Sequence, residues 1–150
     1  MNKDKVSVKD RLTLVAEVDN IKFFNDSRAC SPDATKWALT QIDSPVVLIA
    51  GGKDINIDFS AILDQIRKKV KGIILIGEAA EKIRSVFKRL TALDEAGSME
   101  EAVDKAFHKA KPGDCVLLSP MCPSFDMFLD YEDRGRRFKE AVYGLAEGKK

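Results

Sequence analysis

The sequence predicts a three-layer α/β sandwich, in which helices cover both faces of a mostly parallel sheet that follows an N-terminal β-hairpin. Short apolar runs of strand length alternate three to four times with longer stretches of helical periodicity. The runs at residues 46–50 and 73–76 are continuously aliphatic, as in strands that are buried on both faces. With 150 residues, of which 45% are hydrophobic and 33% charged, the chain has the size and composition of one globular domain.

The N-terminal part predicts a flexible arm followed by the hairpin. Residues 1–10 are charged and lack periodicity, so we interpret them as an arm or as the remnant of a linker from a preceding domain. The domain itself is expected to cover residues 11–150. Apolar and polar residues alternate before Asp19 and Asn20, which favour a turn, and an apolar run resumes after them, so a β-hairpin is expected there.

Capping residues set the expected bounds of two later helices. Ser31 and Pro32 supply an N-cap and a first helical position, and Ser98 with Glu101 reads as a capping box. In chain order, the expected elements after the hairpin are a helix over 32–41, a strand over 45–50, a helix over 59–70, a strand over 72–76, a helix over 79–90, a short strand near 91–93, a helix from 99 to 110, a strand over 115–118 and a helix over 131–145.

Four strand ends are candidates for one ligand-binding rim of the sheet. In open α/β sheets, ligands gather beyond the carboxyl ends of the strands, where helix N-termini favour anions. Ser124 and the amides that follow it come after the strand at 115–118, so we expect a small anionic ligand there. The four candidate segments are 25–30, 51–58, 77–78 and 119–124.

Two of these segments have an ordinary structural interpretation beside the functional one. Asn25, Asp26 and Ser27 could turn the chain and cap a helix, or Asp26 could accept hydrogen bonds from ligand hydroxyls while Arg28 meets a phosphate or carboxylate. Gly51 and Gly52 favour a tight turn over nucleotide binding, because the third glycine of G-x-G-x-x-G is absent. A dinucleotide-binding domain built on these glycines is therefore the weakest of the functions considered for this chain.

Composition and missing motifs exclude several classes of function. The 25 basic and 24 acidic residues balance, which predicts neither a nucleic-acid nor a membrane partner. One histidine, His108, and three scattered cysteines give no metal-ligand cluster, so no metal is expected, and the free thiols favour a reduced, cytoplasmic location. The phosphate loop G-x-x-x-x-G-K-[ST] is absent. The charged residues 132–137, with Glu132 four residues before Arg136, are expected to form a salt-bridged exposed face that includes Arg134.

Three segments, in this order and spacing, carry a resemblance to a known family. They are residues 24–29 (FNDSRA), residues 47–52 (VLIAGG) followed by Asp58 and Phe59, and residues 117–126 (LLSPMCPSFD) followed by Glu132, Arg134, Gly135, Phe138 and Lys139. Together they resemble the C-terminal domain of the Mur ligases, and among these the members that add D-glutamate. The resemblance extends from about Arg11 to Leu145.

The resemblance implies a Rossmann-like fold and a part in amide formation. In that family this domain follows a UDP-sugar-binding domain and a central ATPase domain. The implied reaction uses ATP and Mg²⁺ to phosphorylate UDP-N-acetylmuramoyl-L-alanine on its carboxylate, and the amine of D-glutamate then attacks the acyl phosphate. ATP and Mg²⁺ belong to the complete enzyme, so this domain alone is expected to hold no cofactor and to be inactive by itself.

Carried over by position, the resemblance also implies roles for individual residues. Ser124 and the backbone around Tyr131 would hold the side-chain carboxylate of D-glutamate. Asn25 and Asp26 would lie at the nucleotide, with Asp26 on the ribose, and Arg28 would lie near the phosphates and the incoming amino acid.

Some positions depart from the family pattern. Cys30, in the substrate site, replaces a usual threonine, and Asp10 stands where the family commonly has histidine. Ile55 takes the place of a basic residue that meets the D-glutamate carboxylate, which makes Lys53 the candidate for that contact. These departures keep open a second interpretation, a stand-alone α/β binding or regulatory module without ligase activity.

Overall fold

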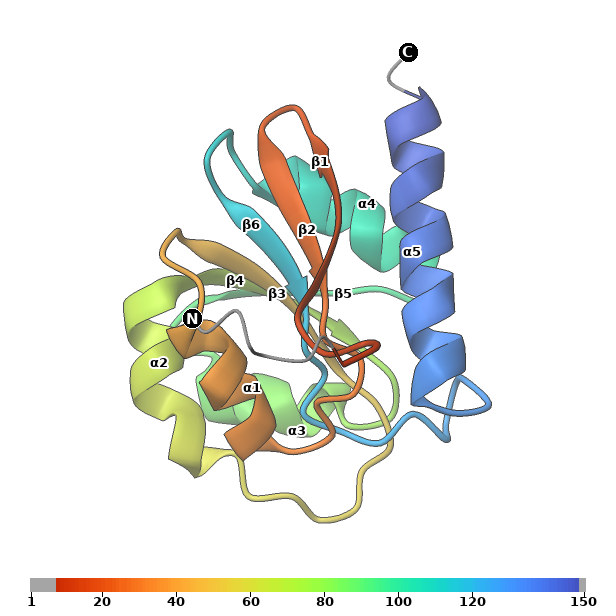
Figure 1. The fold of residues 1–150 in the computed structure, drawn as a ribbon. Helices are drawn as coiled ribbons and strands as arrows, with labels where there is room; N and C mark the ends of the chain where they lie inside the picture. Colours follow the sequence, from red (N-terminus) through yellow and green to blue (C-terminus); the bar gives the residue numbers. More distant parts are fainter. Residues whose placement is uncertain (1–7, 149–150) are drawn as a thin grey trace.

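The computed structural model describes residues 8–148, which form one six-stranded sheet between two layers of helices (Figure 1). The strand order is β1-β2-β6-β3-β4-β5, with β1 antiparallel to β2 and the other neighbours parallel. This confirms the predicted three-layer α/β sandwich. The strands are β1 (Thr13–Val18), β2 (Ile21–Asn25), β3 (Val46–Gly51), β4 (Val70–Ile76), β5 (Ala92–Glu95) and β6 (Cys115–Leu118).

The helices divide between the two faces of the sheet. One face carries α1 (Pro32–Thr40), the 3-10 turn η2 (Ser60–Ile62), α2 (Leu63–Lys69) and α3 (Ala80–Phe87), and the other carries α4 (Met99–Lys109) and α5 (Tyr131–Gly148). In Figure 1 the long helix α5 lies beside the β1-β2 hairpin. No helix within residues 8–148 combines the length and the apolar composition needed to cross a bilayer.

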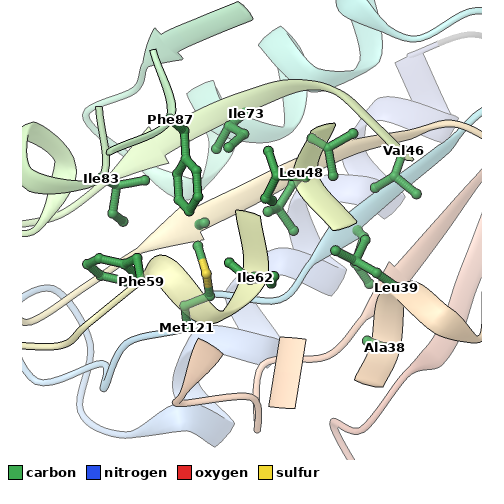
Figure 2. Packing of buried hydrophobic residues seen from close by; sticks show 14 of the residues in the cluster. Ala38, Leu39, Val46, Leu48, Phe59, Ile62, Ile73, Ile83, Phe87 and Met121 are labelled. Atoms are coloured by element: carbon green, nitrogen blue, oxygen red, sulfur yellow. The ribbon is translucent and has the colours of Figure 1, made fainter. Parts of the chain in front are cut away.

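Alternation along the buried strands supplies both halves of the core. In β3, Val46, Leu48 and Ala50 pack toward α1, α2 and α3, whereas Val47 and Ile49 pack toward α4 and α5. Figure 2 shows the half of the core on the side of α1, α2 and α3, where Phe59 and Phe87 are in edge-to-face contact at a ring-centre distance of 6.4 Å. Continuous aliphatic runs in the sequence therefore do mark strands covered on both faces.

The hairpin forms where the sequence predicts it. Its two turn residues, Asp19 and Asn20, have φ angles of 52° and 65°, the left-handed region that a type I′ turn requires at both central positions. Asp and Asn tolerate this conformation better than other residues with a Cβ, so the turn is encoded locally.

The expected helix over 59–70 is wrong at both ends. It begins as η2 and ends at Lys69, because Val70 is the first residue of β4 and pairs with Val46. Val70 is a buried β-branched residue, and sheet pairing takes precedence over the apolar helical stripe to which it also conforms. The expected helix over 79–90 also ends early, at Phe87.

Both predicted N-caps are present. The Ser31 hydroxyl accepts a hydrogen bond from the Ala34 amide at 3.2 Å, and the Ser98 hydroxyl accepts one from the Glu101 amide at 3.1 Å. The Glu101 carboxylate reaches back to the amide of Gly97 at 2.7 Å, one residue before the cap. Side-chain caps thus fix the starts of α1 and α4.

The entry of the chain into the domain is packed. Residues 1–7 of the expected arm lie outside the described residues, but Asp10 is buried. Its carbonyl accepts a hydrogen bond from the Arg28 amide at 2.9 Å, and its Oδ1 accepts one from Asn25 Nδ2 at 2.7 Å. The folded part of the chain therefore includes Asp10, one residue before the expected boundary.

Candidate functional site

The four candidate segments meet along one edge of the sheet, which we call the rim (residues 25–30, 51–58, 77–78 and 119–124). Leu118, the last residue of β6, pairs with Asn25 on one side and Ile49 on the other, and Gly51 pairs with Ile76. Hydrogen bonds continue past the strands, because the Asp26 amide donates to the Leu118 carbonyl at 2.7 Å and the Gly51 amide to that of Pro120 at 2.9 Å. The predicted common edge is confirmed.

Asp26 lies inside the domain. Its carboxylate accepts hydrogen bonds from Arg11 at 2.9 and 3.1 Å, from the Leu12 amide at 3.0 Å and from the Ser119 hydroxyl at 2.7 Å. Burial raises the pKa of Asp26 to about 6, against the opposing effect of Ser119 and Arg11. The Ser119 hydroxyl also lies 2.8 Å from that of Thr35, which links the rim to α1.

Arg28 is the exposed cation of the first rim segment. Its guanidinium lies 4.7 Å from the centre of the Tyr131 ring, a cation–π contact that fixes the side chain across the start of α5. Asn25, by contrast, is buried, and its Oδ1 accepts a hydrogen bond from the Ser27 amide at 3.0 Å. Arg28 therefore offers hydrogen-bond donors to solvent, whereas Asn25 shapes the turn beneath it.

Arg134 corrects the expected exposed face of α5, because its side chain is fully buried. Its guanidinium donates to the Ser27 hydroxyl at 2.9 Å, the Ser27 carbonyl at 2.7 Å and the Cys122 carbonyl at 2.8 Å. Cys30 Sγ accepts a weaker hydrogen bond from it at 3.5 Å. Burial lowers the pKa of Arg134, and no carboxylate among residues 8–148 pairs with it.

The other charged residues at the start of α5 pair differently from the expected spacing. Arg136 contacts Asp133, three residues before it, and Glu132 lies 3.8 Å from Lys9 in place of the expected pair with Arg136. Asp133 also accepts a hydrogen bond from the Leu129 amide at 3.0 Å. Only Arg134 of this segment turns inward to hold the rim loops together.

The expected tight turn at Gly51 and Gly52 is wrong, because Gly51 is the last residue of β3 and Gly52 continues as irregular backbone, with φ angles of 128° and 151°. A Cβ on Gly51 would lie 1.9 Å from the carbonyl oxygen of Ile76, and one on Gly52 would lie 2.3 Å from that of Pro123. Only glycine permits this approach of two backbones. The two glycines bring Lys53 beside the last rim segment, where the Lys53 amide donates to the Pro123 carbonyl at 2.9 Å.

Ser124 opens the turn that leads toward α5. Its carbonyl accepts hydrogen bonds from the amides of Met127 and Phe128 at 3.2 and 3.0 Å. Ser124 itself is buried, and the next side chain, Phe125, is 71% exposed. The Tyr131 carbonyl is already engaged, since it accepts from the Ser27 hydroxyl at 2.7 Å.

The arrangement suits the binding of an anion. Arg28 and Lys53 are cations at the carboxyl edge of the sheet, and the segment with Ser124 follows β6, which lies between β2 and β3 in the strand order. Burial raises the pKa of the nearby Cys122 thiol to about 12, which keeps it neutral and unreactive. Among the residues that the structure describes, no group of three His, Cys, Asp or Glu side chains could hold a metal ion.

Sequence reasoning missed three residues that organise the rim: Arg11, Ser119 and Arg134. Their roles depend on contacts between residues far apart in the chain, such as the 107 residues that separate Arg134 from Ser27. The sequence held one indication of the role of Arg11, because an aspartate such as Asp26 at the end of a strand needs a compensating cation once it is buried.

Comparison with known proteins defines the class of this chain. The sequence profile of the family described as "Mur ligase, glutamate ligase domain" matches residues 10–122, and the chain belongs to that family. It is 45% identical over 142 residues to UDP-N-acetylmuramoylalanine--D-glutamate ligase of Thermoanaerobacter sp. (strain X514), with 92% of this chain and 31% of that protein covered. The enzyme of the same name from Chlorobaculum tepidum is 47% identical over 138 residues, with 92% and 30% covered. The chain thus spans about a third of the length of these relatives.

Solved structures share the fold at low identity. The MurF ligase of Thermotoga maritima in complex with ADP superposes with a TM-score of 0.61 at 14% identity, covering 96% of this chain and 33% of that one. The bifunctional folylpolyglutamate synthase/dihydrofolate synthase of Yersinia pestis gives a TM-score of 0.59 at 15% identity, covering 95% and 32%. In each case this chain corresponds to about a third of the solved chain.

Proposed function

We propose that this chain is the C-terminal, amino-acid-binding domain of an ATP-dependent ligase that joins D-glutamate to UDP-N-acetylmuramoyl-L-alanine in peptidoglycan precursor synthesis. Its relatives at 45–47% identity carry that enzyme's name. The observation that carries the proposal is the rim itself, where the loops with Arg28 and Lys53 lie on either side of the loop with Ser124 in the strand order. The cations Arg28 and Lys53 suit an amino acid with two carboxylates.

On the substrate side, the proposal gives each rim residue a role. Ser124 donates a hydrogen bond to the side-chain carboxylate of D-glutamate, and the backbone around Tyr131 lines the same place. Lys53 and Arg28 supply charge, and Cys30 lies at the wall of the site, where its thiol faces the buried Arg134 guanidinium. The chain's own part in the reaction is therefore to bind and orient the amine that attacks.

On the nucleotide side, Asn25, Asp26 and Arg28 are proposed to contact ATP or ADP. Arg28 is the exposed member, and Asp26 is buried, so a ribose hydroxyl would have to replace one of its present donors. A magnesium site needs several oxygen ligands, and no group of three His, Cys, Asp or Glu side chains within residues 8–148 is placed to supply them, so the residues present do not fit the metal. Mg²⁺ and the phosphate loop are therefore assigned to the remainder of the longer enzyme. We place that enzyme in the cytoplasm, because the three cysteines of this chain are free thiols.

The test is a Ser124→Ala substitution in the ligase that contains this chain. Loss of a hydrogen bond to a charged carboxylate costs about 1–3 kcal/mol, so kcat/KM for D-glutamate should fall by roughly five- to 150-fold. Ser85→Ala, which removes an exposed hydroxyl on α3 that bonds only the Lys82 carbonyl, serves as the control and should leave kcat/KM unchanged. Normal kinetics in the Ser124 variant would refute the assignment.

One observation favours a second function, a stand-alone binding module. Ile55, in the loop after β3, is 56% exposed and apolar at the position where the family carries a basic residue. A chain that binds D-glutamate or ADP with equal affinity in the presence and absence of the other two domains would support the module.

A further inference from the structure

Lys53 is not free in this structure, because Glu78 holds it. Lys53 Nζ lies 3.2 Å from Glu78 Oε1 and 3.3 Å from Oε2, so the ammonium contacts both oxygens of one carboxylate. Glu78 Oε1 also accepts a hydrogen bond from the Asp54 amide at 3.0 Å. These contacts close the loop after β3 onto the loop after β4.

Backbone contacts fix this pair close to Ser124. The Lys53 amide donates to the carbonyl of Pro123, the residue before Ser124, and the Ala79 amide donates to the Gly52 carbonyl at 2.8 Å. The Glu78 amide in turn donates to Asp126 Oδ2 at 2.7 Å, two residues after Ser124. The carboxylate of Glu78 therefore stays beside the rim at the place where Lys53 would meet an anion.

We propose that Glu78 sets the affinity of the rim for its anionic ligand, by occupying Lys53 as an internal carboxylate that the ligand must displace. The inference rests on the proposed function, in which the ligand carboxylate is that of D-glutamate. Its chemistry is an exchange of one carboxylate for another on the Lys53 ammonium, and no covalent bond is made or broken.

The pair is suited to exchange because both partners are solvent-exposed. The Lys53 side chain is 42% exposed and that of Glu78 is 48% exposed, and ion pairs at such positions contribute little to stability. Lys82, on α3, lies 3.6 Å from Asp54, so this neighbouring acid has its own cation and does not take over Lys53. A ligand carboxylate that also bonds Ser124 can therefore replace Glu78 at small cost.

Glu78→Gln is the informative substitution. Glutamine keeps an oxygen that accepts from the Asp54 amide, and it removes the charge that binds Lys53. The chain with this change should bind D-glutamate about two- to fivefold more tightly, as expected when a surface ion pair of ordinary strength no longer competes. The matched control is Asp104→Asn, which removes one exposed carboxylate that pairs with His108 on α4, and it should leave the dissociation constant unchanged.

The measurement is an NMR titration of the 150-residue chain with D-glutamate, in four forms: wild type, Glu78→Gln, Lys53→Gln and the double variant. Tighter binding by Glu78→Gln that disappears in the Lys53→Gln background supports the inference. Wild-type binding with no gain in Glu78→Gln, or an equal gain without Lys53, overturns it and leaves the proposed function standing. If neither the wild type nor Glu78→Gln binds D-glutamate, the proposed function fails together with it.

Discussion

Arg134 is the residue whose replacement tests the architecture of the rim most severely. Arg134→Met keeps the apolar volume and removes the guanidinium, which leaves the buried carbonyls of Ser27 and Cys122 without their donor. Each unsatisfied buried acceptor costs about 1–3 kcal/mol. Removing a buried charge that lacks a carboxylate partner relieves some desolvation, so the two effects oppose each other. Because two short hydrogen bonds to carbonyls are lost, we expect a net loss of about 2–4 kcal/mol in the free energy of unfolding.

The assay is urea unfolding followed by circular dichroism, with Arg136→Met as the control. Arg136 is on the same helix, but its side chain is 56% exposed and pairs with Asp133, so its replacement should change stability by less than about 0.5 kcal/mol. An Arg134 variant as stable as the wild type would show that the guanidinium does not hold the rim loops. Equal losses in the two variants would refute the reasoning as well.

Two further predictions concern the same rim. Gly52→Ala should lower the free energy of unfolding in urea by more than about 2 kcal/mol, because the new Cβ would lie 2.3 Å from the Pro123 carbonyl oxygen. The control is Gly144→Ala, whose Cβ meets nothing within 4 Å and which should be neutral or slightly stabilising. Equal effects of the two substitutions would contradict the close approach of the Gly52 and Pro123 backbones. The pKa of Asp26 is about 6 in the folded state against an ordinary 3.8, so the folded state binds the proton of Asp26 more tightly than the unfolded state does. This tighter binding adds to the free energy of unfolding in full below pH 3.8, and the contribution is lost as the pH rises to 6. The wild type should therefore lose about 3 kcal/mol over this range relative to Asp26→Asn, and parallel pH profiles of the two proteins would contradict it.

Local patterns in the sequence predicted most of the fold. The Asp19-Asn20 turn, the cap at Ser31 and the continuous aliphatic strand β3 each depend on a few neighbouring residues, and each appears as expected. The helix that was expected to include Val70 shows the limit, because an apolar residue that fits a helical stripe also fits a buried strand, and only the pairing with Val46 decides between them.

The site was predictable as a place and less so as a set of contacts. Parallel strands align their carboxyl ends, so the loops after β2, β3, β4 and β6 had to meet. The burial of Asp26 and Arg134 could not be predicted in the same way, because each depends on partners that the fold brings from far along the chain. A charged residue at the start of a helix is usually solvated, and only the three-dimensional packing shows that Arg134 is not.

The measurement that tests the central claim most directly is a titration of the isotope-labelled chain with D-glutamate, L-glutamate and ADP into the millimolar range. We expect chemical-shift changes confined to Arg28, Lys53, Glu78 and residues 124–131, and larger for D-glutamate than for L-glutamate. Shifts of equal size for both enantiomers, or shifts that fall on surfaces away from the rim, would contradict the assignment of this chain as a D-glutamate-binding domain.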